Sequence, residues 1–408
     1  MGQVIGDVDF CALGSAAARR ARADEQRAAL VQREATVRAF VCHDPDAPSA
    51  SDRPLAGALI GVKDIIATAD FPTAYGHAEA PGERREDAWC VARVRQLGGT
   101  ILGKTVCTAF AYPMPGPTTN PHDAGRTPGG SSSGSAAAVA AGFVSFALGT
   151  QTAGSTVRPA AYCGVVGLKP SFGLLPTDGI QPIATTLDHV GIFAASPRDA
   201  WFMTSAMIRT PEIVAPQRPR RLLLLRLPPE LPQHDAYPER LAALAAALRQ
   251  DDITVDAIDL PFPVADFRTL QQQLCYWEAA RIIMVPGSVR LVPELVALLA
   301  PYRDADGTAY AAARRRRQAY QMQFDTLAGD YDAVMMPSAT GAAPPLASTG
   351  DAVMNRFWTA LHVPAINVPF WRNDAALPLG LQLVGALGTD RALAAVAQWF
   401  HQRADRAR

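Results

Sequence analysis

Apolar and polar positions alternate along the N-terminal part of the chain in a way that indicates stacked helices and strands. Residues 14–40 are rich in Ala, Arg, Glu and Gln and predict a helix. Residues 59–66 form a short apolar run with branched side chains, whose length favours a strand. Residues 88–97 predict a helix that ends at a glycine pair, and residues 100–106 predict the next strand. This alternation is typical of α/β layers.

Two stretches of small residues break the alternation. Residues 111–135 contain repeated prolines and end in a Gly/Ser-rich run, so they predict a long loop. Residues 136–148 are apolar and predict a buried helix, and residues 149–159 predict a second loop of small residues. A loop as long as the first is usually either functional or disordered. Its position between strongly apolar segments favours the functional interpretation.

The second half of the chain has a different pattern. Prolines and charges become more frequent over residues 211–263, where a Leu-rich strand is predicted at 221–226. Residues 266–328 have few helix breakers and are predicted to be mainly helical. Residues 332–398 return to strands and a terminal helix, and no internal repeat stands out.

Composition narrows the class of protein. The chain has 408 residues, with 38 Lys and Arg balanced by 38 Asp and Glu. This zero net charge argues against a nucleic-acid binder or a polybasic membrane binder, and the arginine run at residues 314–317 is expected to be a solvated helix face. Apolar residues make up 49% of the chain, which is enough for a large core, so global disorder is excluded.

Cysteine usage and the N-terminal sequence predict an intracellular protein. The cysteines are scattered without a Cys-x-x-Cys pair, so neither a disulfide framework nor a zinc site is expected. The N-terminal sequence lacks the basic and apolar regions of a signal peptide. The most apolar run, residues 136–148, is shorter than the roughly 20 residues that a bilayer span needs. We therefore expect a cytoplasmic protein without a membrane segment.

Three local motifs suggest chemistry that their surroundings disfavour. Gly98–Thr105 matches the phosphate-binding pattern G-x-x-x-x-G-K-T, but a predicted helix precedes it and its centre reads as a strand. Gly130–Gly134 matches G-x-S-x-G around Ser132, with His189 among the available histidines, but the hydrophobic strand that a nucleophile elbow requires is missing. Cys163 has apolar neighbours, which raise the pKa of a thiol and make it unreactive.

A lysine and two serines suggest a fourth chemistry. Lys63 lies in an apolar run, where lost hydration lowers the pKa of the ammonium group and lets the amine act as a base. Ser131 and Ser155 lie in the two small-residue loops and could relay protons between that base and a substrate. Glycine before Ser155 allows backbone N–H groups to face a developing oxyanion. The alternative is a salt bridge between Lys63 and Asp64, with two ordinary glycine-rich turns.

Several motifs in these segments occur in the order of one known family. The longest are GGSSSGSAAAVAAG at residues 129–142, ALGTQTAGS at 147–155 and RPAAYCGVVGLKP at 158–170. Shorter ones are GVKD at 61–64, GKT at 103–105, PGPTTNP at 115–121 and LPLGLQLVG at 377–385. Together they resemble the amidase signature family, and the resemblance is specific because many motifs recur in the family's order.

The resemblance implies a fold for the whole chain. Members of this family have a single large α/β domain with a central mixed β-sheet flanked by helices, which we expect over residues 1–408. Residues 55–205 would form the signature core, and residues 333–400 the C-terminal return to that core. Residues 211–330 carry little of the resemblance and are expected to be a variable helical region.

The resemblance also implies a serine–serine–lysine triad. The family's nucleophile falls on Ser155, its base falls on Lys63, and its bridging serine, which follows a cis peptide bond, falls on Ser131. The implied chemistry is amide hydrolysis through an acyl-enzyme, with no metal or organic cofactor. The implied oxyanion donors are the backbone N–H groups of Thr152, Ala153, Gly154 and Ser155.

Candidate pocket residues follow from the same loops. The Pro-rich loop leads directly into Ser131, so Tyr112, Met114 and Thr118 are expected to line a substrate pocket. Arg158 is a further candidate because it follows the implied nucleophile closely.

The chain departs from the family pattern at several positions near this site. Ala153 stands where the family commonly has glycine, Gln151 where it has Asp, and Ala109 where many members have Glu. Arg158 lies three residues after Ser155, whereas the family's arginine often lies two residues after the nucleophile. Because the triad is complete, we interpret these departures as the pattern of a subgroup.

These observations predict an amidase that cleaves a small carboxamide or a urea-like amide and releases ammonia or an amine. Esterase activity is an expected accompaniment or alternative, because esters form the same acyl-enzyme. A further alternative is the catalytic A-type subunit of an amidotransferase, which passes ammonia to a partner. The complete triad argues against a non-catalytic interaction protein, a homodimer is plausible for the family, and no nucleic-acid partner is expected.

Overall fold

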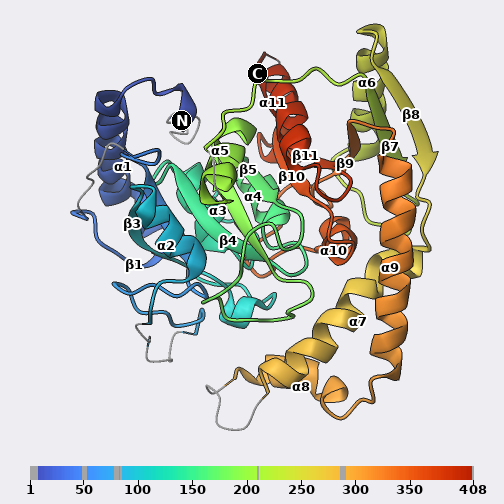
Figure 1. The fold of residues 1–408 in the computed structure, drawn as a ribbon, viewed down its shortest axis with the longest axis horizontal. Helices are drawn as coiled ribbons and strands as arrows, with labels where there is room; N and C mark the ends of the chain where they lie inside the picture. Colours follow the sequence, from blue (N-terminus) through green and yellow to red (C-terminus); the bar gives the residue numbers. More distant parts are fainter. Residues whose placement is uncertain are drawn as a thin grey trace.

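One mixed β-sheet forms the centre of the molecule (Figure 1). The computed structural model describes residues 8–47, 53–77, 82, 85–208, 211–284 and 291–406. In this part of the chain the sheet has 11 strands in the order β1-β3-β2-β4-β6-β5-β10-β11-β9-β7-β8. The strands are β1 (Phe40–His43), β2 (Leu59–Lys63), β3 (Thr100–Thr105), β4 (Phe146–Gln151), β5 (Val166–Lys169), β6 (His189–Ala194), β7 (Arg221–Arg226), β8 (Thr254–Asp259), β9 (Ala333–Pro337), β10 (Ala365–Arg372) and β11 (Pro378–Val384).

The sheet contains both parallel and antiparallel pairs. β3, β2 and β4 are parallel neighbours near one edge, and β9, β7 and β8 are parallel neighbours at the other. Antiparallel pairing through β6, β5, β10 and β11 joins the two parallel blocks. The prediction of an α/β fold with a central mixed sheet is therefore confirmed.

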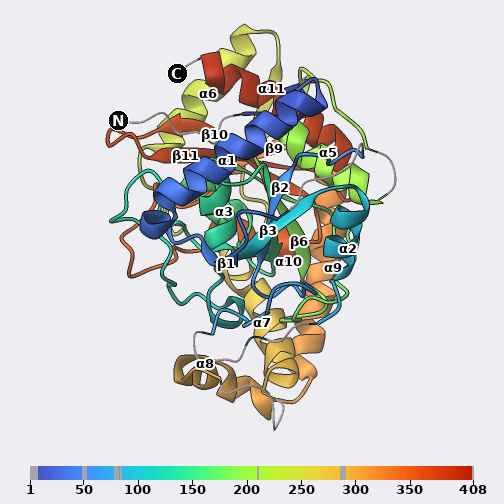
Figure 2. The ribbon, with the colours of Figure 1, turned by 90° about the vertical axis from the view of Figure 1, so that its left-hand side faces the viewer.

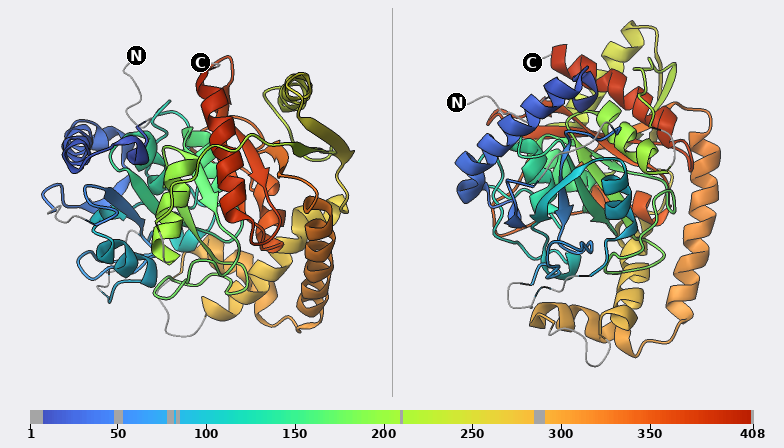
Figure 3. Two further views of the ribbon diagram at one scale, coloured as in Figure 1. Left: turned by 45° about the horizontal axis from the view of Figure 1, so that its top comes forward. Right: turned by 60° about the vertical axis from the view of Figure 1, so that its left-hand side comes forward.

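Helices pack on both faces of the sheet, as Figures 2 and 3 show from further directions. α5 and α11 contact each other and cover β5, β6 and β10, whereas α3 and α4 contact each other and lie over β4, β5 and β10. The described helices are α1 (Ala16–Val37), α2 (Trp89–Gln96), α3 (Ser133–Ala140), α4 (Val157–Cys163), α5 (Pro197–Ile208), α6 (Tyr237–Gln250), α7 (Val264–Ile282), α8 (Pro293–Arg303), α9 (Thr308–Ala328), α10 (Val353–Ala360) and α11 (Asp390–Arg406), with short 3-10 turns at Phe10–Ala12 and Ala109–Ala111.

Side chains of the central strands alternate between two cores. In β4, Phe146 and Leu148 belong to the larger apolar core, which also contains Phe202 of α5. Ala147 points the other way, into the smaller core that contains Leu30 of α1 and the alanines of α3. Because successive strand residues face opposite sides, a strand that is buried on both faces is mostly apolar rather than alternating. This explains why β4 reads as a continuous apolar run.

The same property explains a prediction that is wrong. The apolar run at residues 136–148 was expected to form one buried helix, but α3 ends at Ala140 and β4 begins at Phe146. Between them Gly142 has a φ of +73°, a conformation that glycine adopts easily and that ends the helix. A short apolar run has no periodicity that distinguishes a buried helix from a buried strand. The helices predicted at 14–40 and 88–97 and the strands predicted at 100–106 and 221–226 are confirmed by α1, α2, β3 and β7.

The region between residues 264 and 328 forms a helical arm. Figure 1 shows α7 and α9 side by side, with α8 at the end furthest from the sheet, as the prediction of a mainly helical segment requires. α7 also packs against α10, with Phe267 beside Phe357 at a ring distance of 5.0 Å. The arm therefore contacts the body along α7, because Glu278, near the other end of this helix, also accepts hydrogen bonds from Thr185 Oγ1 and the Thr186 N–H. None of the helices in the described part of the chain combines the length and the apolar character that a bilayer span requires.

Candidate active site

Lys63 and the segment that carries Ser155 meet where two neighbouring strands of the sheet end. Lys63 is the last residue of β2, and Ser155 lies in the turn between β4 and α4. β2 and β4 are parallel neighbours, so their C-terminal ends lie side by side. Ser131 precedes α3, and this helix packs against β2 and β4. The sheet thus brings together residues that are far apart in the sequence.

Lys63 is fully buried and has hydroxyl groups as its partners. Its Nζ lies 2.7 Å from Ser131 Oγ and 2.7 Å from Thr150 Oγ1. Burial lowers the pKa of the Lys63 amine to about 8, although the charges of Cys107 and Asp188 oppose this shift. The neutral form of the amine, which can accept a proton, is therefore far more populated near neutral pH than in an ordinary lysine.

Asp64 does not neutralise Lys63. Its carboxylate lies 3.6 Å from Nζ of Lys104 and accepts hydrogen bonds from the backbone N–H groups of Ala74 and Gly76. The salt bridge that the sequence left open for Lys63 is thus made by Lys104. This arrangement keeps an ionic partner away from Lys63 and favours its neutral form.

Hydrogen bonds to the carbonyls of the peptide units before and after Ser131 fix its backbone. The Gly130–Ser131 peptide bond is cis, as the family resemblance implied. The guanidinium of Arg158 donates to the Gly130 carbonyl at 2.7 Å, and the Thr108 N–H donates to the Ser131 carbonyl at 3.1 Å. The Ser131 side chain therefore points at Lys63 from a fixed backbone.

Ser155 follows a turn that Gln151 organises. Gln151 Oε1 accepts hydrogen bonds from the N–H groups of Thr156 at 2.8 Å and Val157 at 3.0 Å. It thereby satisfies donors at the start of α4 that lack a helical partner. A neutral amide thus caps α4 where the family commonly has a carboxylate, which shows that the departure at position 151 is structurally accommodated.

A cavity of about 360 Å³ joins the two serines. Ser131 and Ser155 both line it, together with Tyr112 and Arg158, and α7 closes one side with Gln271, Gln272, Cys275 and Tyr276. Met114 and Thr118 are not among the described residues that line it, and Thr118 Oγ1 instead donates to the Arg38 carbonyl at 2.7 Å, at the end of α1. Of the implied oxyanion donors, Thr152, Ala153 and Ser155 line the cavity.

Sequence reasoning missed several residues at this site. Thr150 Oγ1 is, beside Ser131 Oγ, the second hydrogen-bond partner of Lys63 Nζ. Asp188 accepts a hydrogen bond from Thr152 Oγ1 at 2.5 Å. Burial raises the pKa of Asp188 to about 6. Thr150 lies within the motif at residues 147–155, but nothing in that motif marks it as a partner of Lys63, and Asp188 belongs to none of the motifs. The four residues of α7 lie in the region with little family resemblance.

The alternative chemistries find no support in the geometry. Residues 100–105 are the strand β3, and Lys104 is buried within it, so no phosphate-binding loop forms. The Ser132 hydroxyl is hydrogen-bonded to the backbone of Thr150 on β4. The Cys163 thiol is fully buried near the Pro128 carbonyl, and burial raises its pKa.

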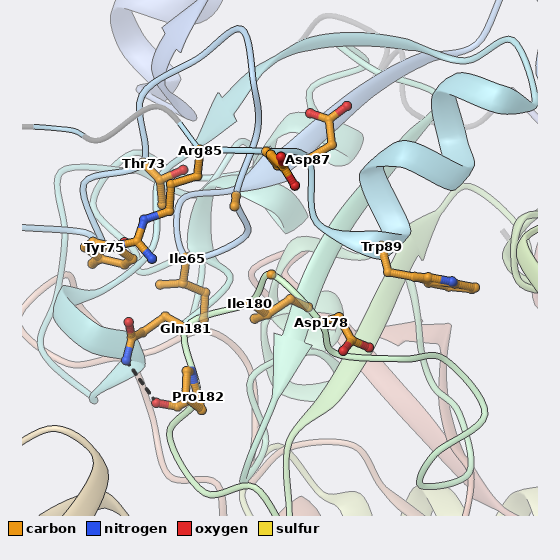
Figure 4. A pocket seen from close by; sticks show the side chains of 13 residues that line it. Ile65, Thr73, Tyr75, Arg85, Asp87, Trp89, Asp178, Ile180, Gln181 and Pro182 are labelled. Atoms are coloured by element: carbon orange, nitrogen blue, oxygen red, sulfur yellow. Dashed lines mark hydrogen bonds between the residues drawn. The ribbon is translucent and has the colours of Figure 1, made fainter.

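A larger cavity of about 490 Å³ lies elsewhere (Figure 4). Trp89, Asp178 and Gln181 are among its lining residues, and none of Lys63, Ser131 and Ser155 is. Its size alone therefore does not make it the candidate catalytic site.

Known proteins resemble this chain along most of its length. The family model described as Amidase matches residues 15–221. The A-type subunit of the glutamyl-tRNA(Gln) amidotransferase from Treponema pallidum (strain Nichols) is 30% identical, and the match covers 93% of this chain and 87% of the relative. Among solved structures, an amidase superposes with a TM-score of 0.82 at 25% identity, covering 96% of this chain and 97% of the other. The native peptide amidase from Stenotrophomonas maltophilia superposes with a TM-score of 0.80 at 28% identity, with coverage of 98% and 95%.

Proposed function

Because this chain belongs to the amidase family and is an amide-cleaving hydrolase, we propose that it hydrolyses a small carboxamide through an acyl-enzyme on Ser155. The observation that supports this most directly is the 2.7 Å contact between Lys63 Nζ and Ser131 Oγ, beside the cavity that Ser131 shares with Ser155. We infer that the buried amine of Lys63 and the hydroxyls of Ser131 and Ser155 at the cavity wall form a path for one proton.

The proposed reaction starts with proton transfer along this path. Ser155 passes its proton to Ser131 as Ser131 passes its own to the neutral amine of Lys63. Ser155 Oγ attacks the carbonyl carbon, and the carbonyl oxygen becomes an oxyanion that faces the N–H groups of the 152–155 turn. The proton returns to the leaving nitrogen, the C–N bond breaks, and ammonia or an amine departs. Water then hydrolyses the acyl-enzyme with the same groups acting as base and acid.

Thr150 prepares Lys63 for its role in this scheme. A neutral amine has two N–H groups and one lone pair. Thr150 Oγ1, at 2.7 Å, can accept one N–H and so turn the lone pair toward Ser131. Thr150 is therefore proposed as a positioning residue for the base.

The cavity suggests the class of substrate. Its volume of about 360 Å³ suits a small molecule rather than a folded protein segment. Arg158 lines the cavity, is buried, and hydrogen-bonds only to backbone carbonyls, and its Nε has no partner within the described chain. We therefore propose Arg158 as a substrate contact that favours an amide bearing a negatively charged or strongly accepting group.

The named relatives favour a second candidate function. Several curated relatives that match this chain are A-type amidotransferase subunits, and the similarity to the Treponema pallidum protein covers 93% of this chain at 30% identity. This finding supports an A-type subunit, which passes ammonia to a partner, better than it supports a free-standing amidase. The chemistry proposed at Ser155 is the same in both cases, and only the fate of the ammonia differs.

A panel of amides, esters and urea derivatives with ammonia detection separates the candidates. Ammonia released by the purified chain alone supports the free-standing amidase, whereas release only after addition of partner subunits supports the amidotransferase. Ser155→Ala should abolish turnover and labelling by a serine-directed phosphonate while the fold persists. Ser145→Ala is the matched control, because Ser145 is a buried serine at the opposite end of β4. A Ser155→Ala variant with most of its activity would remove Ser155 as the nucleophile.

A further inference from the structure

Two side chains from outside the family motifs hold the turn before Ser155. We call residues 151–155 the oxyanion loop. Gln271 Nε2, on α7, donates to the Thr152 carbonyl at 2.8 Å, and Thr359 Oγ1, on α10, donates to the Ala153 carbonyl at 2.6 Å. Gln271 is 3% exposed and Thr359 is completely buried, so neither bond competes with bulk water.

These bonds determine where two N–H groups point. In a trans peptide unit the C=O and the N–H point in opposite directions. A donor on the Thr152 carbonyl therefore directs the Ala153 N–H to the opposite side, and a donor on the Ala153 carbonyl does the same for the Gly154 N–H. Neither N–H has a hydrogen-bond acceptor in the described part of the chain. Both are thus free to meet a ligand atom in the cavity that Ala153 and Ser155 line.

From this geometry we propose that Gln271 and Thr359 are positioning residues that aim the Ala153 and Gly154 N–H groups at the oxyanion of the reaction. The inference rests on the proposed function, because it assigns a role within that reaction. It adds two residues that belong to neither the triad nor the motifs around it. One of them comes from the helical arm, which lies beyond the segment that the family model matches.

Gln151 determines how Thr359 uses its single proton. Gln151 Nε2 donates to Thr359 Oγ1 at 2.9 Å, so the hydroxyl acts as acceptor there and its proton must go elsewhere. The Ala153 carbonyl at 2.6 Å is closer than the Asn355 carbonyl at 3.2 Å and takes that proton. A carboxylate at position 151 has no N–H to donate. Gln151 and Thr359 therefore act as a pair that directs one peptide unit of the oxyanion loop.

The third attachment of the loop is the side chain of Thr152. Its hydroxyl donates to the buried carboxylate of Asp188, whose other oxygen accepts from the N–H groups of Ile183 and Ala184. Thr152 is thus fixed through its side chain and through its carbonyl by different elements. The N–H groups of Ala153 and Gly154, which come next in the loop, have no acceptor among the residues that the structure describes.

The test compares variants that remove one donor each. Gln271→Met and Thr359→Val keep the size of the side chain, whereas Thr359→Ser keeps the hydroxyl. Because loss of a whole oxyanion donor lowers kcat about 100- to 1,000-fold, a misaimed donor should lower kcat about 10- to 100-fold. KM should stay within about twofold, since the ground-state carbonyl gains little from these donors. Thr359→Ser should recover most of the lost rate.

A tetrahedral inhibitor supplies a readout that a merely structural role would not move. Affinity for a boronic acid that forms an adduct on Ser155 should fall by the same factor as kcat, while affinity for the carboxylic acid product stays unchanged. Gln273→Met is the matched control, because Gln273 is the same residue type on α7 and contacts Thr269 and Arg316 instead of the oxyanion loop. It should leave kcat and KM at the wild-type values.

The outcomes are distinguishable from failure of the proposed function. Wild-type kcat in Gln271→Met and Thr359→Val, a change in KM alone, or a Thr359→Ser variant as slow as Thr359→Val would overturn the positioning role while hydrolysis by Ser155 stands. A wild-type protein that neither turns over any amide nor reacts with a phosphonate would overturn the proposed function and the positioning role together. Urea unfolding of each variant shows whether it is folded. If Thr359→Val does not fold, the kinetics of Gln271→Met decide whether the positioning role stands.

Discussion

Two buried lysines on neighbouring strands show how local partners decide a residue's chemistry. Lys104, on β3, is close to Asp64 and donates to the Ile66 carbonyl and to Thr73 Oγ1, so its ammonium group is compensated. Lys63, on β2, has only hydroxyl groups within hydrogen-bond distance and no carboxylate within ion-pair distance in the described chain. Burial without an opposite charge destabilises an ammonium group, so Lys63 is the better base.

The pH dependence of activity follows from this environment. Because the proposed reaction needs neutral Lys63 and burial lowers the pKa of its amine to about 8, kcat/KM should fall about tenfold for each pH unit below that value. Replacing the base should cost a factor of about 100 to 10,000, so Lys63→Ala is expected to be nearly inactive across the range. Initial rates between pH 5.5 and 9.5 test this, and a flat profile below pH 8 would contradict it.

Asp188 should shift that profile. Its negative charge raises the pKa of Lys63, and its own pKa of about 6 means that it is ionised where Lys63 titrates. Asp188→Asn removes the charge, so the acidic limb of kcat/KM should move to lower pH, whatever happens to the maximal rate. Asp178→Asn, an exposed aspartate that lines the other cavity, is the control and should leave the midpoint in place. An unchanged or higher midpoint in Asp188→Asn would show that the charge does not act on the base.

At the scale of elements, a glycine lets α3 approach the sheet. A Cβ at Gly134 would lie 2.1 Å from the Ala39 carbonyl oxygen and 2.4 Å from the Val106 nitrogen, which are backbone atoms that cannot rotate away. The Gly134 N–H donates to the Val106 carbonyl at 2.9 Å in the same place. The start of α3 is thus fixed against the backbone, and this start follows Ser131 directly.

Gly134→Ala should therefore affect both stability and the site. Overpacking typically costs about 1–3 kcal/mol, so we expect a decrease of that size in the free energy of unfolding. We also expect a lower kcat, because a shift of α3 would displace Ser131, which lies just before the start of this helix. Gly14→Ala is the control, since no atom lies within 4 Å of the added Cβ. Urea unfolding and steady-state kinetics measure the two effects. Equal stability of the two variants would mean that α3 can move away without cost.

At the scale of the whole molecule, the segment around Phe10 is attached to the core beside the start of β4, whereas Ser155 follows the other end of that strand. Phe10 is buried with its ring 5.3 Å from that of Phe146, at the start of β4. The N–H groups of Phe10 and Cys11 donate to the carboxylate of Asp199 on α5, and Arg198 donates to Asp9. The side chains of Asp9, Cys11 and Asp199 lie close enough to hold a metal ion, but these hydrogen bonds already occupy the carboxylates and attach the segment to α5.

Removal of this anchor should destabilise the protein without changing its chemistry. Phe→Ala substitutions in cores typically cost about 3–5 kcal/mol, so Phe10→Ala should lower the free energy of unfolding by an amount of that order. Val8→Ala, at a position that is 41% exposed, should have little effect. Unfolding in urea measures both, and KM of the folded Phe10→Ala variant should equal that of the wild type. An unchanged free energy of unfolding in Phe10→Ala would show that the segment contributes little to the stability of the core.

The helical arm forms part of the candidate active site. α7 reaches from the arm to the cavity, where Gln271, Gln272, Cys275 and Tyr276 form one side. The region that carries little of the family resemblance thus completes the site that the family motifs begin.

The sequence alone was sufficient for the local elements and for the family. Glycine pairs, charge-rich helical stretches and branched apolar runs predict α1, α2, β3 and β7, because their signals lie within a few residues. The motif loops and the apolar run around a lysine make Ser131, Ser155 and Lys63 the candidate catalytic residues, an assignment that stays a prediction. The sequence could not separate α3 from β4, because both elements are buried on all sides and the run at residues 136–148 that spans them is apolar throughout.

Only the tertiary structure decided which residues surround those three. Thr150, Asp188, Gln271 and Thr359 each contact Lys63 or the oxyanion loop, yet they come from four different elements or loops and share no motif. Their hydrogen bonds exist only because the order of strands in the sheet and the packing of α7 and α10 bring distant segments together. The choice of Lys104 as the partner of Asp64 has the same origin, since adjacency along the chain does not determine which side chains meet across strands.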